Sequence, residues 1–189
     1  MDTKFNFKNF EKLNNPNRLK FIPPSFIWKK LQLLQCSVIL DIGAGTGLFS
    51  RAFLELMGEG TVLAADISND MVNWMKNNLS QKYKGIIPII MDGNCIGINN
   101  QTVDLVLMIS LFHELEDPDN LLKESLRVLK NNGKICIIDW KREKTEFGPP
   151  FEKRYLIEDI EKHLETSGFS DINTDSSLKL HNVLWATKK

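Results

Sequence analysis

The sequence has no excess of charge of either sign. Its 24 lysine and arginine residues are balanced by 24 aspartate and glutamate residues, so the formal net charge is zero. A protein that binds nucleic acid by general electrostatic attraction usually carries a basic excess, so we expect no nucleic-acid partner. The composition is that of an ordinary globular protein, and the 189 residues predict one domain spanning residues 1–189.

The sequence also lacks long apolar runs. No segment approaches the length of about 20 apolar residues that a membrane-spanning helix needs, so no span is expected. The opening residues MDTKFNFKNF lack the apolar core of a secretory signal, and we therefore expect a cytoplasmic protein.

Cysteine is scarce and scattered. The three cysteines, Cys36, Cys95 and Cys136, are odd in number and form no CxxC pair. This argues against a disulfide framework and against a cysteine zinc site, and it suits a reducing compartment. No metal site is predicted.

Short β-rich runs alternate with helical patterns from about residue 37 onward. Several of these runs are apolar throughout, as expected for parallel strands that are covered on both faces. The runs span residues 37–42, 61–66, 85–91, 103–109 and 134–139. Their alternation with helices predicts an α/β fold with a doubly wound sheet.

Most of the segments between the runs predict crossover helices. Ser68 is a good cap for the second of them, and Asp117-Pro118 opens another that Asn131-Asn132-Gly133 ends. Residues 92–101, DGNCIGINNQ, are rich in glycine and asparagine, so we expect a loop there.

The chain changes character after residue 139. Residues 140–156 form a polar loop, and residues 157–167 form a helix that Gly168 ends. Two strands, about 169–175 and 181–187, are joined by a short loop and should therefore pair antiparallel.

The strongest motif leads from the first β run into a helix and reads VILDIGAGTG, residues 38–47. Glycines at the end of a buried strand allow a sharp turn and the close approach of a ligand. The following helix directs free N–H groups at that ligand. A plain strand-to-helix turn is the alternative explanation.

The glycine spacing differs from that of dinucleotide-binding proteins. Their fingerprint is G-x-G-x-x-G, whereas this chain has G-x-G-x-G and places Leu48 at the third glycine position. Asp41, two residues before Gly43, suits a cationic ligand better than a pyrophosphate. An NAD(P)-dependent oxidoreductase therefore remains only as an alternative.

On these residues the sequence resembles the class I S-adenosylmethionine-dependent methyltransferases, in register over residues 36–140, with the last helix and strand pair extending the match. The resemblance implies a Rossmann-like, mostly parallel seven-stranded sheet with one antiparallel C-terminal strand. It also implies that the D-x-G-x-G-x-G segment lies under the methionine and ribose parts of S-adenosylmethionine. The residues at those positions are Asp41, Gly43, Ala44, Gly45 and Gly47.

The resemblance implies contacts at two further strand ends. Asp66 would accept hydrogen bonds from the ribose hydroxyls, and Ile67 would offer an apolar face to the adenine. Asp92 would bond the adenine amino group, with Gly93 beside it. A strand-end residue at Asp66 and an Asp-Gly turn at Asp92 are the alternatives.

The fourth β run ends at Ile109 and Ser110, whose backbone the resemblance places at the methionine end of the cofactor. His113 follows and is the best candidate catalytic residue, because an imidazole there can accept a proton from the acceptor. Local packing of His113 is the alternative. Trp140 is a candidate wall of the acceptor pocket, and His163 and His181 receive no function.

The leader, residues 1–35, includes a helix predicted over residues 25–34 with Leu34 on its buried face. The leader and the segment IIDWKREKTEFGPPFEKR resemble small bacterial and archaeal members near the ubiquinone/menaquinone methyltransferases. Two interpretations of the leader remain: it forms a lid over the acceptor, or it packs on the edge of the sheet. The aromatic residues of such a lid are Phe5, Phe7, Phe10 and Phe21.

The prediction is one methyltransferase domain with a cofactor-binding core at residues 36–140 and a C-terminal helix and strand pair at residues 141–189. It transfers a methyl group from S-adenosylmethionine to a small-molecule acceptor. A non-catalytic protein that binds S-adenosylmethionine is the second alternative. The acceptor and the oligomeric state are not predicted.

Overall fold

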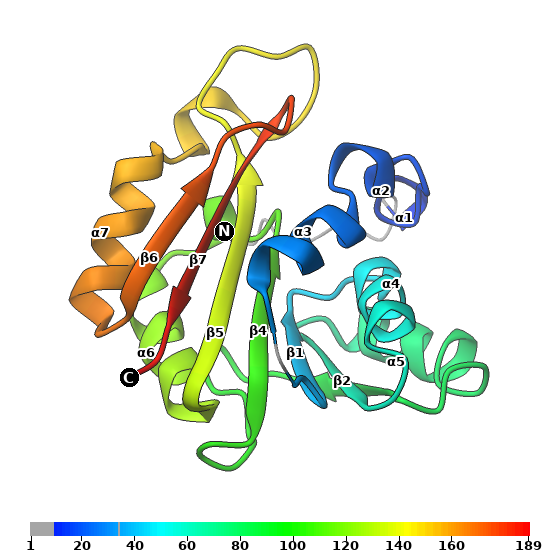
Figure 1. Cartoon of the computed structure of the whole chain (residues 1–189). Helices are drawn as coiled ribbons and strands as arrows, with labels where there is room; N and C mark the ends of the chain where they lie inside the picture. Colours follow the sequence, from blue (N-terminus) through cyan, green and yellow to red (C-terminus); the bar gives the residue numbers. More distant parts are fainter. Residues whose placement is uncertain (1–9, 34) are drawn as a thin grey trace.

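A seven-stranded sheet forms the centre of the computed structural model, which describes residues 10–33 and 35–189 (Figure 1). The strand order is β3-β2-β1-β4-β5-β7-β6. β7 runs antiparallel to both β5 and β6, and the other neighbouring strands pair parallel. The predicted sheet with one antiparallel strand is confirmed. The strands are β1 (Val38–Ile42), β2 (Thr61–Asp66), β3 (Ile86–Ile90), β4 (Val103–Ile109), β5 (Leu129–Trp140), β6 (Ser170–Asp175) and β7 (His181–Thr187).

Helices cover both faces of the sheet, as a doubly wound fold requires. One face packs against α3, α4 and α5, and the other against α6 and α7 (Figure 1). Alternate residues of each strand therefore enter different cores, since side chains along a strand point to opposite faces. The helices are α1 (Phe10–Leu13), α2 (Arg18–Phe21), α3 (Pro24–Leu31), α4 (Leu48–Met57), α5 (Asn69–Asn78), α6 (Pro118–Val128) and α7 (Ile157–Ser167), with the short 3₁₀ helices η2 (Phe112–Glu114) and η3 (Phe151–Lys153).

Local sequence signals determine several helix ends. The Ser68 hydroxyl accepts a hydrogen bond from Met71 N at 3.4 Å at the start of α5. Asp117 accepts from Asn120 N at 3.1 Å at the start of α6, where Pro118 is the first helical residue. Gly168 ends α7 with a φ of 100°, which suits glycine. Residues 92–101 contain no helix, as predicted.

Two predicted helix ends are wrong. α3 ends at Leu31, and Leu34 lies outside the described residues. α6 ends at Val128, and Asn131-Asn132-Gly133 lies inside β5 instead of ending the helix. The reason is tertiary pairing, because buried Leu129 is in register with Val103 of β4. None of the helices in the described part of the chain is long and apolar enough to cross a membrane.

Candidate active site

The glycine loop joins β1 to α4 at the carboxyl edge of the sheet. Gly43, Gly45 and Gly47 have φ values of 70°, 57° and 71°, in the left-handed region that favours glycine. Gly43 N and Ala44 N both donate to Ala65 O, at 2.8 and 3.0 Å, which ties the loop to β2. A Cβ on Gly47 would lie 2.5 Å from Leu79 Cδ1, so this position has no room for a side chain.

Asp66, the last residue of β2, is directly bonded to this loop. Its Oδ2 accepts from Gly45 N at 2.8 Å and its Oδ1 accepts from Ser68 N at 2.9 Å. Burial raises the pKa of Asp66, and the hydrogen bonds from Ser68 N and Gly45 N oppose the rise. A carboxylate oxygen has a second lone pair, so each oxygen can still accept from a ligand.

Asp41 lies beneath the loop and is buried. Ser50 Oγ of α4 donates to Asp41 Oδ2 at 2.6 Å. Burial raises the pKa of Asp41 to about 6, although the Ser50 hydrogen bond and the charge of Arg18 oppose the rise. The Asp41 carboxylate therefore has its hydrogen-bond partner within the protein.

Arg18 of α2 is a residue that sequence reasoning missed. Its guanidinium is 5.1 Å from the Phe49 ring, and its Nη1 donates to Leu13 O at 3.0 Å. Burial lowers the pKa of Arg18, and the charge of Asp41 opposes this. The sequence offered no signal for it, because no recognisable motif surrounds Arg18.

The adenine side of the predicted site is open. Ile67 is 63% exposed, the highest fraction among the exposed large apolar side chains of the described residues. Asp92 is exposed as well, and its backbone pairs with that of Cys95 in a tight turn at 3.0 and 3.2 Å. Gly93 has a φ of 58° within this turn. The structure thus contains the Asp-Gly turn and leaves the Asp92 carboxylate accessible.

The segment after β4 bends sharply beside the loop. Ser110, directly after Ile109, has a φ of 54°, and its N–H donates to Ile138 O at 2.7 Å. The bend brings Leu111 against the glycine loop, where a Cβ on Gly43 would lie 2.8 Å from Leu111 Cδ1. A non-glycine residue in this conformation is uncommon and often marks a functional site.

The described part of the leader lies over the same loop. A Cβ on Gly45 would lie 3.1 Å from Leu13 Cδ1 of α1, and the Phe10 ring is 4.9 Å from the Trp74 ring of α5. Phe21 of α2 is 6.2 Å from Phe147 of the loop after β5. Phe5 and Phe7 lie outside the described residues. α1 therefore contacts the glycine loop and α5, α2 contacts the loop after β5, and a lid over the acceptor stays a prediction.

His113 and Asp139 form a buried pair at the end of β5. His113 Nδ1 lies 2.7 Å from Asp139 Oδ1, and His113 N donates to Asp139 Oδ2 at 3.2 Å. The side chains are 6% and 4% exposed. A carboxylate only accepts hydrogen bonds, so it holds the imidazole proton on Nδ1 and leaves the lone pair on Nε2. The arrangement can accept a proton.

Trp140 is packed among polar and aromatic groups. Its ring centroid is 4.5 Å from the His181 ring, 5.9 Å from the Phe147 ring and 5.3 Å from the Arg154 guanidinium. His181 is 3% exposed, and its Nδ1 has no hydrogen-bond partner. Burial lowers the pKa of His181 to about 4, so the ring is neutral. Sequence reasoning gave His181 no role, since its surroundings arise from the pairing of β5 with β7.

Arg154 organises the loop between β5 and η3. Its guanidinium is 4% exposed and donates to the carbonyl oxygens of residues 141, 143, 147 and 149 and to the Thr145 hydroxyl. The predicted polar loop is therefore held in one conformation by a single side chain. No local pattern in the sequence predicts this role for Arg154.

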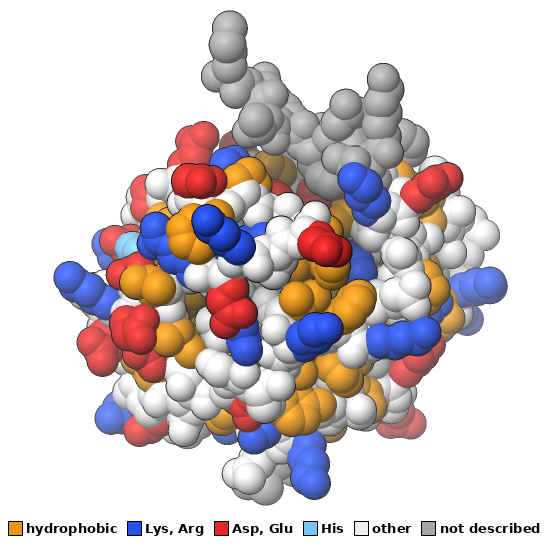
Figure 2. Space-filling view, turned by 90° about the horizontal axis from the view of Figure 1, so that it is seen from above, with side chains coloured by type: hydrophobic (Ala, Val, Ile, Leu, Met, Phe, Trp, Pro, Cys, Tyr) orange, Lys and Arg blue, Asp and Glu red, His pale blue; other side chains and the backbone are white. Residues whose placement is uncertain are grey.

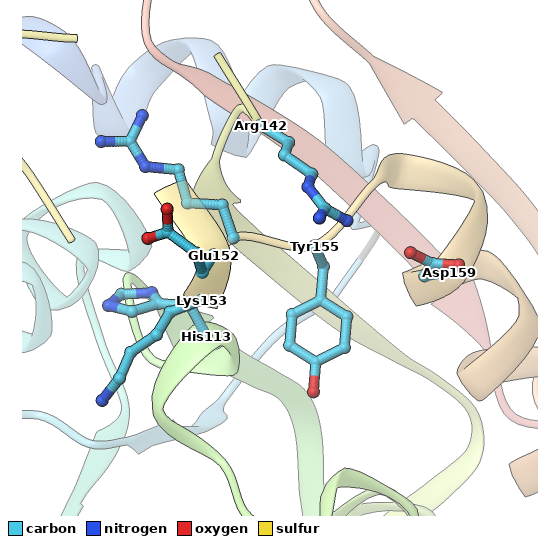
Figure 3. Close-up of a pocket in the computed structure, with 7 residues that line it drawn as sticks. His113, Arg142, Glu152, Lys153, Tyr155 and Asp159 are labelled. Atoms are coloured by element: carbon cyan, nitrogen blue, oxygen red, sulfur yellow. The ribbon is translucent and has the colours of Figure 1, made fainter. Parts of the chain in front are cut away.

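A cavity of about 250 Å³ adjoins His113 (Figure 3). Its other walls come from the loop that Arg154 holds, from η3 and from the start of α7. Seen from above, this edge of the molecule carries hydrophobic side chains interspersed with lysine, arginine and acidic residues (Figure 2). The glycine loop, His113 and the cavity thus lie along the carboxyl ends of β1, β4 and β5, where open α/β sheets bind ligands.

Comparison with known proteins gives the family. The profile of the methyltransferase domain matches residues 40–137, about half of the chain. A crystal structure of an S-adenosylmethionine-dependent methyltransferase from Aquifex aeolicus is similar with a TM-score of 0.91 and 30% identity. That similarity covers 98% of this chain and 100% of the other.

Curated relatives agree with this result. The ubiquinone/menaquinone biosynthesis C-methyltransferase UbiE of Bordetella parapertussis is 24% identical over 178 residues, covering 80% of this chain and 69% of the relative. UbiE of Hydrogenovibrio crunogenus is 30% identical over 111 residues, covering 56% of this chain and 43% of the relative. These matches favour neither the oxidoreductase nor the non-catalytic alternative. The chain belongs to the class I S-adenosylmethionine-dependent methyltransferases.

Proposed function

We propose that this methyltransferase acts on a small-molecule acceptor bound in the cavity beside His113, with the cofactor on the glycine loop. The bonded pair of Asp66 and Gly45 supports the cofactor part of the proposal, because it joins an acidic strand end directly to the backbone of the glycine loop. The residues proposed to hold S-adenosylmethionine are Asp41, Gly43, Ala44, Gly45, Gly47, Asp66, Ile67, Asp92, Gly93, Ile109 and Ser110.

The residues present fit this cofactor. Asp66 has free lone pairs for the ribose hydroxyls, and exposed Ile67 offers an apolar surface to the adenine. The exposed Asp92 carboxylate can accept from the adenine amino group. Asp41 lies two residues before Gly43, and its carboxylate is bonded to Ser50 and feels the charge of Arg18.

The chain's main task is positioning. When bound, S-adenosylmethionine supplies a methyl group already activated by a positively charged sulfur. The protein then has to align the acceptor and exclude water. His113, held by Asp139, accepts a proton at Nε2 where the acceptor arrives protonated. The loop held by Arg154 forms the neighbouring wall, whereas Trp140 packs against Arg154 and is not among the residues that line the cavity.

Calorimetry with purified full-length protein tests the proposal. We expect S-adenosylmethionine and S-adenosylhomocysteine to bind, and NAD not to bind. Release of S-adenosylhomocysteine in the presence of small-molecule acceptors would then identify the substrate. Failure of both sulfur nucleotides to bind would overturn the proposed cofactor site, and binding without turnover on any acceptor would favour the non-catalytic alternative.

A further inference from the structure

The cavity beside His113 has an unusual lining for a ligand site. Most such sites are lined mainly by apolar side chains with a few polar groups. Here five of the seven lining residues carry a formal charge. Apart from His113, the lining residues are Arg142, Glu152, Lys153, Arg154, Tyr155 and Asp159. The ring of Tyr155 is the one large apolar surface among them.

The three cations of the cavity have no carboxylate partner among residues 10–33 and 35–189. The ion pairs of lysine and arginine in the described residues, such as Lys130 with Asp104, lie elsewhere. The carboxylates next to the cavity pair with His113, Asp139 at 2.7 Å and Glu114 at 3.7 Å. Arg154 is surrounded by neutral carbonyl and hydroxyl oxygens, which solvate its charge but do not cancel it. The Arg142 guanidinium is 5.3 Å from the Phe151 ring, and Lys153 is exposed.

The two acidic residues only partly offset these cations. Asp159 lies in the first turn of α7, where the positive end of the helix dipole stabilises it. In Figure 3 its carboxylate lies beyond Tyr155, apart from His113 and Lys153. Glu152 lies near His113 in the same view. The lining residues therefore carry three positive and two negative side chains, and the carboxylates of Asp139 and Glu114 lie beside the His113 ring.

We propose that the methyl acceptor is a small hydrophilic molecule with an anionic group, a carboxylate or a phosphate, which binds to one of the two exposed cations of the cavity, Arg142 or Lys153. This inference rests on the proposed function, since it takes the cavity beside His113 as the acceptor site. A volume of about 250 Å³ suits a small molecule. An isoprenoid tail would strip water from unpaired charges without replacing their hydrogen bonds, so a long apolar acceptor does not fit.

Titration of simple anions into the protein loaded with S-adenosylhomocysteine tests this. Inorganic phosphate and acetate are added separately at low ionic strength and followed by calorimetry. We expect at least one of them to bind, and Arg142→Gln or Lys153→Gln to weaken that binding by about tenfold through loss of a charge-assisted hydrogen bond. Selective binding of phosphate or of acetate identifies which anionic group the acceptor carries, and binding of both supports the site as a general anion site.

Lys123→Gln is the matched control, because Lys123 is an exposed lysine on α6. It should leave anion binding unchanged, and all three variants should keep the wild-type affinity for S-adenosylhomocysteine. The inference is overturned if neither anion binds, or if the Arg142→Gln/Lys153→Gln double variant binds the anion as well as wild type. If the unmodified chain does not bind S-adenosylhomocysteine at all, the proposed function fails first, and this inference fails with it.

Discussion

His113 Nδ1 and Asp139 Oδ1 lie 2.7 Å apart and join the turn after β4 to the end of β5. The two residues are 26 positions apart in the chain, and both side chains are nearly inaccessible to solvent. The Trp140 N–H also donates to Asp139 Oδ1 at 2.7 Å, so the carboxylate is itself held in place. This pair determines which ring nitrogen of His113 faces outward.

We predict that neutral His113 carries its proton on Nδ1. Nitrogen NMR of the labelled imidazole should detect this tautomer in wild type and a mixed population in Asp139→Ala, which removes the hydrogen-bond acceptor. Once a methyl acceptor is known, both His113→Gln and Asp139→Ala should lower turnover by about 10²–10⁴-fold with unchanged cofactor affinity. His163→Gln removes a comparable histidine that bonds Asp119 at 2.6 Å and should change neither readout. An unaltered tautomer in Asp139→Ala would contradict the assignment.

Asp66→Ala should weaken the binding of S-adenosylhomocysteine by about 1–3 kcal/mol, since the ribose hydroxyls lose the carboxylate that accepts their hydrogen bonds. The substitution also removes the hydrogen bond that Gly45 N donates to the Asp66 carboxylate at 2.8 Å. Calorimetry measures the effect, and Asp70→Ala is the control, because Asp70 is an exposed carboxylate in the first turn of α5. Equal affinities for Asp66→Ala and wild type would remove Asp66 from the cofactor site.

Gly47→Ala should destabilise the fold more than Gly97→Ala. Both glycines have nearly the same positive φ, 71° and 70°, so alanine costs about 1–2 kcal/mol of backbone strain at either position. Only at Gly47 does the added Cβ also clash, 2.5 Å from Leu79 Cδ1, whereas at Gly97 it meets nothing within 4 Å. Overpacking adds about 1–3 kcal/mol at Gly47. Urea unfolding measures the difference, and equal losses at the two positions would show that the clash is relieved without cost.

Two buried groups give opposite pH dependences of stability. Burial lowers the pKa of His181 from 6.5 to about 4, so its contribution is complete above pH 6.5 and is lost as the pH falls toward 4. Burial raises the pKa of Asp41 from 3.8 to about 6, so the native state gains stability as the pH falls from 6 toward 3.8. Each effect amounts to at most ~3 kcal/mol, and the two largely cancel in wild type.

Single substitutions should therefore separate the two effects. Relative to wild type, His181→Phe should gain stability as the pH falls from 6.5 to 4.5, because only the Asp41 effect remains. Asp41→Asn should lose stability over the same range, because only the His181 effect remains. Unfolding free energies from denaturant titration at several pH values provide the comparison, and parallel pH profiles for the two variants would show that the groups do not titrate as described.

Much of the fold and part of the candidate site follow from local patterns. Apolar runs identified the cores of β1 to β5, and Ser68, Asp117 and Gly168 marked helix ends that the structure contains. The end of α6 could not be predicted in this way. Asn131-Asn132-Gly133 has the local chemistry of a turn, but the pairing of Leu129 with Val103 extends β5 through it.

The doubly wound sheet, the glycine loop and the order of acidic residues on successive strand ends can be predicted from local patterns, because periodicity and turn chemistry depend on neighbouring residues. Three features depend instead on tertiary packing: Asp139 orients His113, His181 is buried against Trp140, and Arg154 holds the wall of a charged cavity. These contacts join residues from different strands and loops. Their distances depend on how the strands pair and the loops pack, which no local pattern specifies.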